Sequence, residues 1–157
     1  MTARIATLVA LPFILAACGD SSPADDMDAG AADTPPPSAE AAAPERSVTI
    51  VAPAAGDTVP AGAVEIVLSV DGLQVVPAGD STANSGHHHL FLDADVSPAG
   101  EPIPAVEGSI VHMGDGSTTY TFENVTPGEH RVIAVLGDWQ HVPLEPMVND
   151  TIVFVAR

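Results

Sequence analysis

Hydrophobic and polar residues alternate with a period of two in several short segments of this chain. In segment 64–70 the even-numbered positions are all apolar, whereas Glu65 and Ser69 lie between them. The same alternation recurs in segment 119–123. Successive side chains of a β-strand point to opposite faces, so this pattern predicts strands with one buried and one exposed face.

Seven strands of this kind are predicted after residue 46, separated by turns. The turns are rich in glycine, proline and aspartate, as at Pro127-Gly128, where proline fixes φ of one central residue and glycine accepts a positive φ at the next. Beyond residue 47 the chain has no sustained helical period. The predicted strands cover residues 47–52, 64–70, 86–93, 108–113, 117–125, 130–136 and 151–155.

The number and spacing of these strands indicate the fold class. Seven short strands within about 110 residues, with turns at short intervals, are typical of an immunoglobulin-like sandwich. We therefore predict an all-β fold, a single immunoglobulin-like antiparallel β-sandwich of about seven strands over residues 47–157. A small β-barrel is the alternative.

The start of the chain has the pattern of a secretory signal. Arg4 precedes an apolar stretch that ends at Leu15, and two alanines then lead into Cys18, the single cysteine. This is the layout of a signal peptide, and the Leu15-Ala-Ala-Cys18 sequence resembles the lipobox of bacterial lipoproteins. We expect residues 1–17 to be removed and Cys18 to be lipidated. A simple signal peptide with an incidental cysteine is the alternative.

These features predict where the protein resides. The apolar stretch is shorter than the ~20 residues of a transmembrane helix, so lipid on Cys18 would attach the protein to the membrane. We expect a cell-envelope lipoprotein that faces the periplasm. Gly19 follows the cysteine, where an aspartate is associated with retention in the inner membrane, so the outer membrane is preferred.

The composition of residues 18–46 predicts a disordered tether. Alanine, proline and acidic residues dominate this segment, and Met27 is its only large apolar residue. Such a segment cannot bury enough apolar surface to offset the entropy of ordering. The tether would hold the folded domain away from the membrane.

The charge of the chain excludes one class of partner. It has 21 acidic residues against 4 that are lysine or arginine, a formal net charge of -17. This charge repels phosphate backbones, so we expect no nucleic-acid binding. The same charge attracts cations, although it also fits a simple solvated acidic surface. The sequence indicates no particular protein partner.

The histidines are the strongest candidates for chemistry. His87 and His89 are two positions apart on a predicted strand, so their rings project from one face about 6–7 Å apart at the backbone. Imidazoles at this spacing can share a metal ion, with zinc–nitrogen bonds of ~2.0–2.1 Å. His112, on another predicted strand, or His141, in a loop, would complete the site.

The two remaining histidines are predicted to be structural. His88 shares a face with Leu90 and Leu92, which predicts a ring packed in the core. His130 follows the Pro127-Gly128 turn and is predicted to cap a hairpin. In the alternative to metal binding, the pair of His87 and His89 on a half-exposed strand forms hydrogen bonds to its neighbours.

The available donor atoms restrict the metal. Without a free thiolate, an imidazole site suits zinc, copper(II), nickel or iron, and we expect copper or zinc. Met113 or Met147 would favour copper(I) if its sulfur reached the site, and Asp93 or Asp138 would orient the rings. Ligating imidazoles must be neutral, so we expect binding to weaken as the pH falls through about 6.5.

Several motifs resemble one bacterial family. Ser85-Gly-His-His-His-Leu-Phe-Leu-Asp93, Ile110-Val-His-Met-Gly114, Thr126-Pro-Gly-Glu-His130 and Gly137-Asp-Trp-Gln-His141 are similar to the domain of unknown function 4399. The resemblance covers roughly residues 47–157 and implies an exported or lipid-anchored protein, but no activity. The family carries a further histidine shortly after the position of His141, and this chain lacks it.

Three functions follow from these observations. The first is a binding module that holds a transition metal ion for storage, delivery or structure. The second is a structural or interaction domain that presents loops to an envelope partner. The third, a metal-dependent enzyme, is the weakest because the sequence contains no recognisable nucleophile or paired general acid and base. We therefore expect no enzymatic activity.

Overall fold

The computed structural model describes residues 45–157. The predicted signal peptide, the predicted lipidation site at Cys18 and the predicted tether up to residue 44 lie outside the described residues. Within the described part of the chain, no helix is long and apolar enough to cross a membrane.

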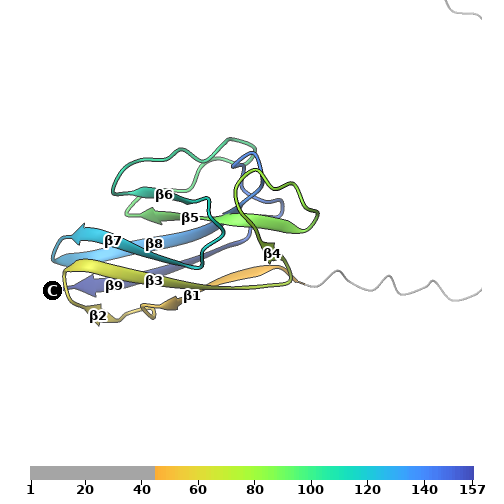
Figure 1. The fold of residues 1–157 in the computed structure, drawn as a ribbon. Coiled ribbons are helices and arrows are strands. Elements are labelled where there is room, and N and C mark those ends of the chain that lie inside the picture. The colour runs from red at the N-terminus through yellow and green to blue at the C-terminus, as the bar shows by residue number, and fades with distance from the viewer. Residues whose placement is uncertain (1–44) are drawn as a thin grey trace, which may run out of the picture. The chain divides into compact units, whose positions relative to one another are not determined.

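Nine strands form two sheets in the described residues (Figure 1), which confirms the all-β class. The first sheet has the order β1-β3-β7, and the second has the order β2-β9-β8-β5-β4, with β6 also paired to β5. The strands are β1 (Ser47–Ala52), β2 (Thr58–Val59), β3 (Gly62–Asp71), β4 (Gln74–Val75), β5 (Ser85–Leu92), β6 (Ile110–Met113), β7 (Thr119–Val125), β8 (Gly128–Gly137) and β9 (Asn149–Ala156).

All seven predicted strands are present, and two more join them. The additional strands, β2 and β4, have two residues each and pair in parallel with β9 and β5. A pairing of two residues leaves no period in the sequence, which is why the pattern predicted seven strands rather than nine.

The main apolar core lies between the two sheets. The predicted alternation of segment 64–70 is confirmed, because Val64, Ile66 and Leu68 of β3 are buried and Glu65 is exposed. From the opposing sheet, Leu90, Val132, Leu136 and Phe154 contribute to the same cluster of buried side chains.

A second, smaller apolar cluster covers the outer face of the larger sheet. It consists of Phe91, Ile103, Ile133 and Val135, with Ile110 packed against it. Phe91 of β5 lies opposite Ile133 of β8, and Ile103 comes from the long loop between β5 and β6, which lies at the top of the domain in Figure 1. Strand β5 is therefore buried on both faces, and this double burial accounts for its lack of simple alternation.

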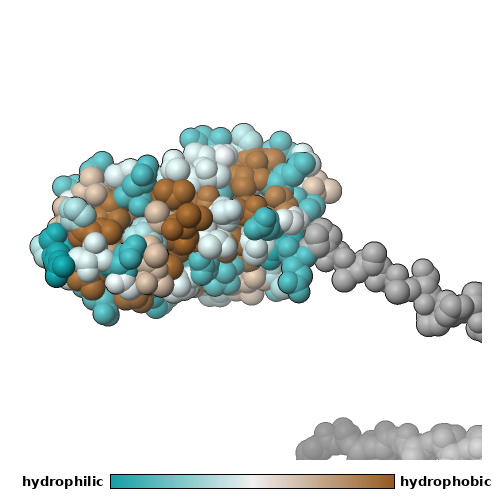
Figure 2. Space-filling model, turned by 90° about the horizontal axis from the view of Figure 1, so that it is seen from below, coloured by the Kyte–Doolittle hydropathy of each residue, from teal (hydrophilic) through white to brown (hydrophobic). Residues whose placement is uncertain are grey.

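Apolar side chains also reach the surface, but in separate patches. On the face shown in Figure 2 they lie between hydrophilic side chains rather than in one continuous area. Scattered exposed apolar residues are normal on protein surfaces, so this face gives no indication of a large apolar docking surface.

Candidate metal centre

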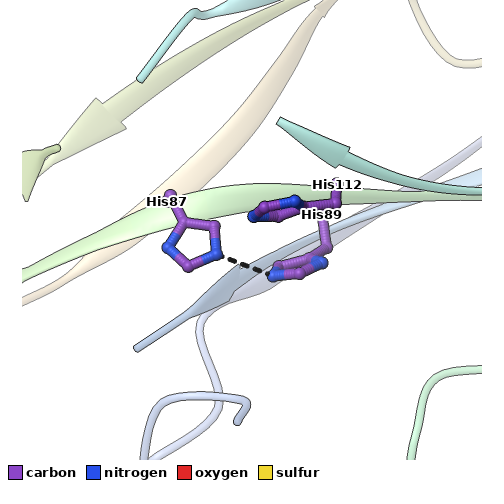
Figure 3. Close-up of side chains that lie close together, drawn as sticks. All are labelled: His87, His89 and His112. Atoms are coloured by element: carbon purple, nitrogen blue, oxygen red, sulfur yellow. Dashed lines mark hydrogen bonds between the residues drawn. The ribbon is translucent and has the colours of Figure 1, made fainter. Parts of the chain in front are cut away.

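His87 and His89 project from the same face of β5, as the period of two predicts. Their ring centroids are 4.8 Å apart and their Nε2 atoms are 3.1 Å apart (Figure 3). Only one proton can lie between the two nitrogens, so one neutral ring donates and the other accepts. Both side chains are buried, with 1% and 0% of their surface exposed, whereas the structural alternative assumed a half-exposed strand.

His112 completes a group of three. It lies on β6 directly opposite His89, and the two rings stack with centroids 5.1 Å apart. One ligand nitrogen from each of His87, His89 and His112 lies within 4.8 Å of the others, close enough for one metal ion. His112 is exposed, so this side of the group is open to solvent.

His141 also reaches this group. Its ring centroid lies 5.0 Å from that of His87, 5.8 Å from that of His89 and 4.6 Å from that of His112. The sequence left the third ligand open between His112 and His141, and the structure places both beside the buried pair. The set of nitrogens within 4.8 Å of one another includes His112 but not His141.

Asp138 shapes the loop that carries His141. The backbone N–H of His141 donates to the Asp138 carbonyl at 2.9 Å, and the Asp138 N–H donates to the Val142 carbonyl at 2.8 Å. The Oδ1 atom of Asp138 accepts the backbone N–H groups of Gln140 and Val142 at 2.8 and 2.9 Å. Trp139 lies in this loop with 51% of its surface exposed.

Two glycines provide the room that the rings occupy. A Cβ atom at Gly114 would lie 2.4 Å from Cε1 and 2.8 Å from Nε2 of His112. A Cβ atom at Gly137 would lie 2.9 Å from Nε2 of His89. The sequence showed both glycines in the family-like motifs, but gave no sign that they adjoin the histidines, because that contact depends on strand pairing.

Replacing Gly114 with alanine should therefore displace the His112 ring. The glycine does not have a positive φ, so alanine fits the backbone. Its Cβ atom would clash with the His112 ring, which can rotate away, and would lie 3.2 Å from the Cβ atom of Ala78. We expect zinc affinity to fall by about tenfold or more, the size of effect seen when ligand orientation is lost. Isothermal titration calorimetry measures this change.

A double-mutant cycle provides the control for this prediction. If Gly114→Ala acts through the His112 ring, it should have little further effect on zinc affinity in a His112→Ala background. An undiminished effect in that background would show that the substitution disturbs the site by another route.

Burial keeps the inner rings neutral. It lowers the pKa of His89 to about 3 and that of His87 to about 4, and the charges of neighbouring histidines add to both effects. Burial and His141 also lower the pKa of His112. Neutral imidazole is the form that binds metals. The pH of about 6.5, below which metal binding was predicted to weaken, is therefore too high for the buried pair.

His88 and His130 have the structural roles that the sequence predicts. His88 is fully buried in the core, with Nδ1 3.0 Å from the Ser117 carbonyl. The His130 Nε2 lies 2.8 Å from the Thr126 carbonyl at the β7–β8 turn, and its Nδ1 lies 2.6 Å from Asp93. Burial alone would lower the pKa of His130, but its bonds to Asp93 and Thr126 raise it.

These contacts also remove other candidates from the site. Asp93 accepts hydrogen bonds from His130 and from the backbone of Arg131, so it is engaged away from the cluster. Asp138 is the other carboxylate that was predicted to orient the rings. Its charge acts on His87 and raises the pKa of that ring, against the larger effect of burial. Met113 is buried in the main core, on the strand face opposite to that of its neighbour His112, so its sulfur does not reach the rings.

Comparison with known proteins identifies the family. The family described as "Domain of unknown function (DUF4399)" matches residues 66–156. The chain belongs to this family. The matched DUF4399 region contains β5, β6 and all four clustered histidines. No curated protein matches the chain.

One solved structure is distantly similar. It is the crystal structure of an engineered protein, with a TM-score of 0.40 and 14% sequence identity, and the match covers 72% of this chain and 20% of that chain. The DUF4399 chain thus spans about a fifth of that protein's length.

Proposed function

We propose that this DUF4399 protein is a cell-envelope module that binds a divalent transition metal ion through His87, His89 and His112. The proximity of three ligand nitrogens, all within 4.8 Å of one another, is the observation that carries the proposal. An ion bound to two nitrogens at ~2.0–2.1 Å with a tetrahedral angle holds them about 3.3 Å apart. The Nε2 atoms of His87 and His89 are already 3.1 Å apart.

The environment of the rings supports the same proposal. His87 and His89 are neutral at pH 7 because burial lowers the pKa of each, and a metal ion would replace the one proton between them. The net charge of -17 attracts cations to the surface. Imidazole donors suit zinc or copper. We propose binding rather than catalysis, because the observation that carries the proposal concerns metal ligands alone.

Metal analysis of the full-length protein, purified without added metal or a histidine tag, tests the proposal. We expect about one zinc or copper ion per chain, or one high-affinity site when zinc is titrated into the metal-free protein. Binding no tighter than millimolar would reject the metal and favour the structural alternative. The Nε2–Nε2 contact of 3.1 Å fits that alternative as well, in which it is a hydrogen bond within a packed network.

The pH dependence of binding distinguishes the buried site from surface histidines. With the pKa of His87 at about 4 and that of His89 at about 3, protons compete with the metal only in strongly acidic solution. We expect zinc affinity to change by less than about tenfold between pH 7 and 5.5. Three ordinary histidines with a pKa of about 6.5 would lose about 600-fold over the same range. Calorimetry at both pH values measures the difference.

We also propose that lipid on Cys18 anchors the protein in the cell envelope, facing the periplasm. The Leu15-Ala-Ala-Cys18 motif after an apolar stretch supports this location. Cys18→Ser should leave the protein without lipid and move processed protein from the membrane to the soluble fraction. Mass spectrometry and membrane fractionation check both results, and persistent lipidation of the variant would contradict the assignment.

We propose, further, an immunoglobulin-like topology for the domain. The β1-β3-β7 sheet has the order of immunoglobulin strands A, B and E, and the β9-β8-β5 part of the second sheet has the order of strands G, F and C. In this topology β5 occupies the place of strand C, and its outer face carries His87 and His89.

A further inference from the structure

We propose that His141 is the fourth ligand of the ion, so that the centre is a closed tetrahedral site of four imidazoles that suits zinc better than copper(II) or nickel(II). This inference rests on the proposed function, because it concerns the same ion. To the three ligands of the proposed function it adds a fourth, and it narrows the divalent transition metal to zinc.

The positions of the four rings indicate the tetrahedron. An ion bound to imidazole nitrogen lies about 3.2 Å from the ring centroid, so four rings in a tetrahedron have six centroid separations of about 5.2 Å. A square-planar site would have four separations of about 4.5 Å and two of about 6.4 Å. The six observed separations all fall between 4.6 and 5.8 Å. The rings thus stand at the corners of a distorted tetrahedron.

Within this arrangement His141 caps a triangle. The rings of His87, His89 and His112 have nearly equal separations of 4.8, 4.9 and 5.1 Å. His141 meets each of them nearly edge to face, at interplanar angles of 67° to 79°. Rotation of its ring about the Cβ–Cγ bond exchanges ring carbons for nitrogens, so a nitrogen can face the ion without movement of the backbone.

The backbone at His141 is the second observation. Asp138 and Val142 close a three-residue loop, and such loops place a residue in the left-handed region, where glycine is favoured. Here His141 takes that position, with φ 66°. A side chain in this conformation costs stability that glycine would not. The cost is explained if the ring at this position is needed as a ligand.

The donor set and the geometry together select the metal. The four candidate ligands are imidazoles, and the sulfur of Met113 is buried in the main core. Zinc has no geometric preference of its own and forms tetrahedral sites readily, whereas copper(II) and nickel(II) favour tetragonal ones. Four protein ligands leave no open position for a substrate, which is the mark of a holding site rather than a catalytic one.

The test uses the full-length protein loaded with zinc or cobalt(II), and the variant His141→Gly. In the unaltered protein we expect four nitrogen neighbours of zinc at about 2.0 Å by X-ray absorption, and the strong visible absorption of tetrahedral cobalt(II). In His141→Gly we expect zinc affinity to fall at least about tenfold and the cobalt absorption to weaken. The thermal midpoint of the metal-free variant should stay the same or rise, because glycine accepts the left-handed backbone.

The matched control is Gln140→Gly, one residue earlier in the same loop. It should leave zinc affinity and the cobalt spectrum unchanged. Unchanged affinity in His141→Gly, with three nitrogens and one oxygen around zinc in the unaltered protein, would overturn this inference and leave the three-histidine proposal intact. A lower midpoint of the metal-free His141→Gly variant would also contradict it, by giving His141 a structural role. Absence of zinc binding in the unaltered protein would instead reject the proposed function itself.

Discussion

Replacing His87 and His89 together with alanine should abolish stoichiometric zinc binding. The two Nε2 atoms, 3.1 Å apart, form the preorganised half of the site, and only His112 and His141 would remain beside the ion. At a zinc concentration one thousand times Kd, the unaltered protein should gain about 4.1 kcal/mol in the free energy of unfolding. The double variant should gain none. Thermal unfolding with and without zinc measures the gain.

Two further variants keep this prediction testable if the double variant folds poorly. His112→Ala removes an exposed ring, so it should preserve the fold while it lowers zinc affinity by at least about tenfold. His130→Gln is the matched control, because His130 is bonded to Asp93 and Thr126 rather than to the cluster. It should leave zinc affinity unchanged. Equal zinc stabilisation of the unaltered protein and His112→Ala would contradict the assignment.

The strands with one buried face were predictable from the sequence. Segment 64–70 alternates because β3 has the core on one side and solvent on the other. Strand β5 does not alternate, because the main core lies on one face and the loop that carries Ile103 covers the other. That covering loop is a tertiary feature, and the sequence therefore gave no sign that His87 and His89 are buried.

The candidate site was predictable where it depends on one strand. The period of two places His87 and His89 on one face and, by the same rule, His112 and Met113 on opposite faces. The choice between His112 and His141 could not be made, because it depends on the register that sets His89 opposite His112 and on a loop that returns beside β5. The register and the loop bring both rings to the pair.

The second large effect concerns the apolar cluster behind the site. Phe91 is fully buried in the cluster with Ile103, Ile133 and Val135. Phe91→Ala should cost about 3–5 kcal/mol in the free energy of unfolding, from the lost apolar burial and the cavity, out of a typical total of about 5–15 kcal/mol. Urea unfolding of the metal-free protein measures the cost.

Zinc binding should weaken in the same variant. Phe91 lies on the same face of β5 as His87 and His89. The cavity left by the Phe91→Ala substitution would loosen the loop that covers this face. The control is Val153→Ala on β9, with 40% of its surface exposed, for which we expect a loss of about 0.5 kcal/mol or less. A similarly small loss in Phe91→Ala would show that the loop packs only weakly on the sheet. In that case the burial that keeps His87 and His89 neutral would have to come from the strands alone.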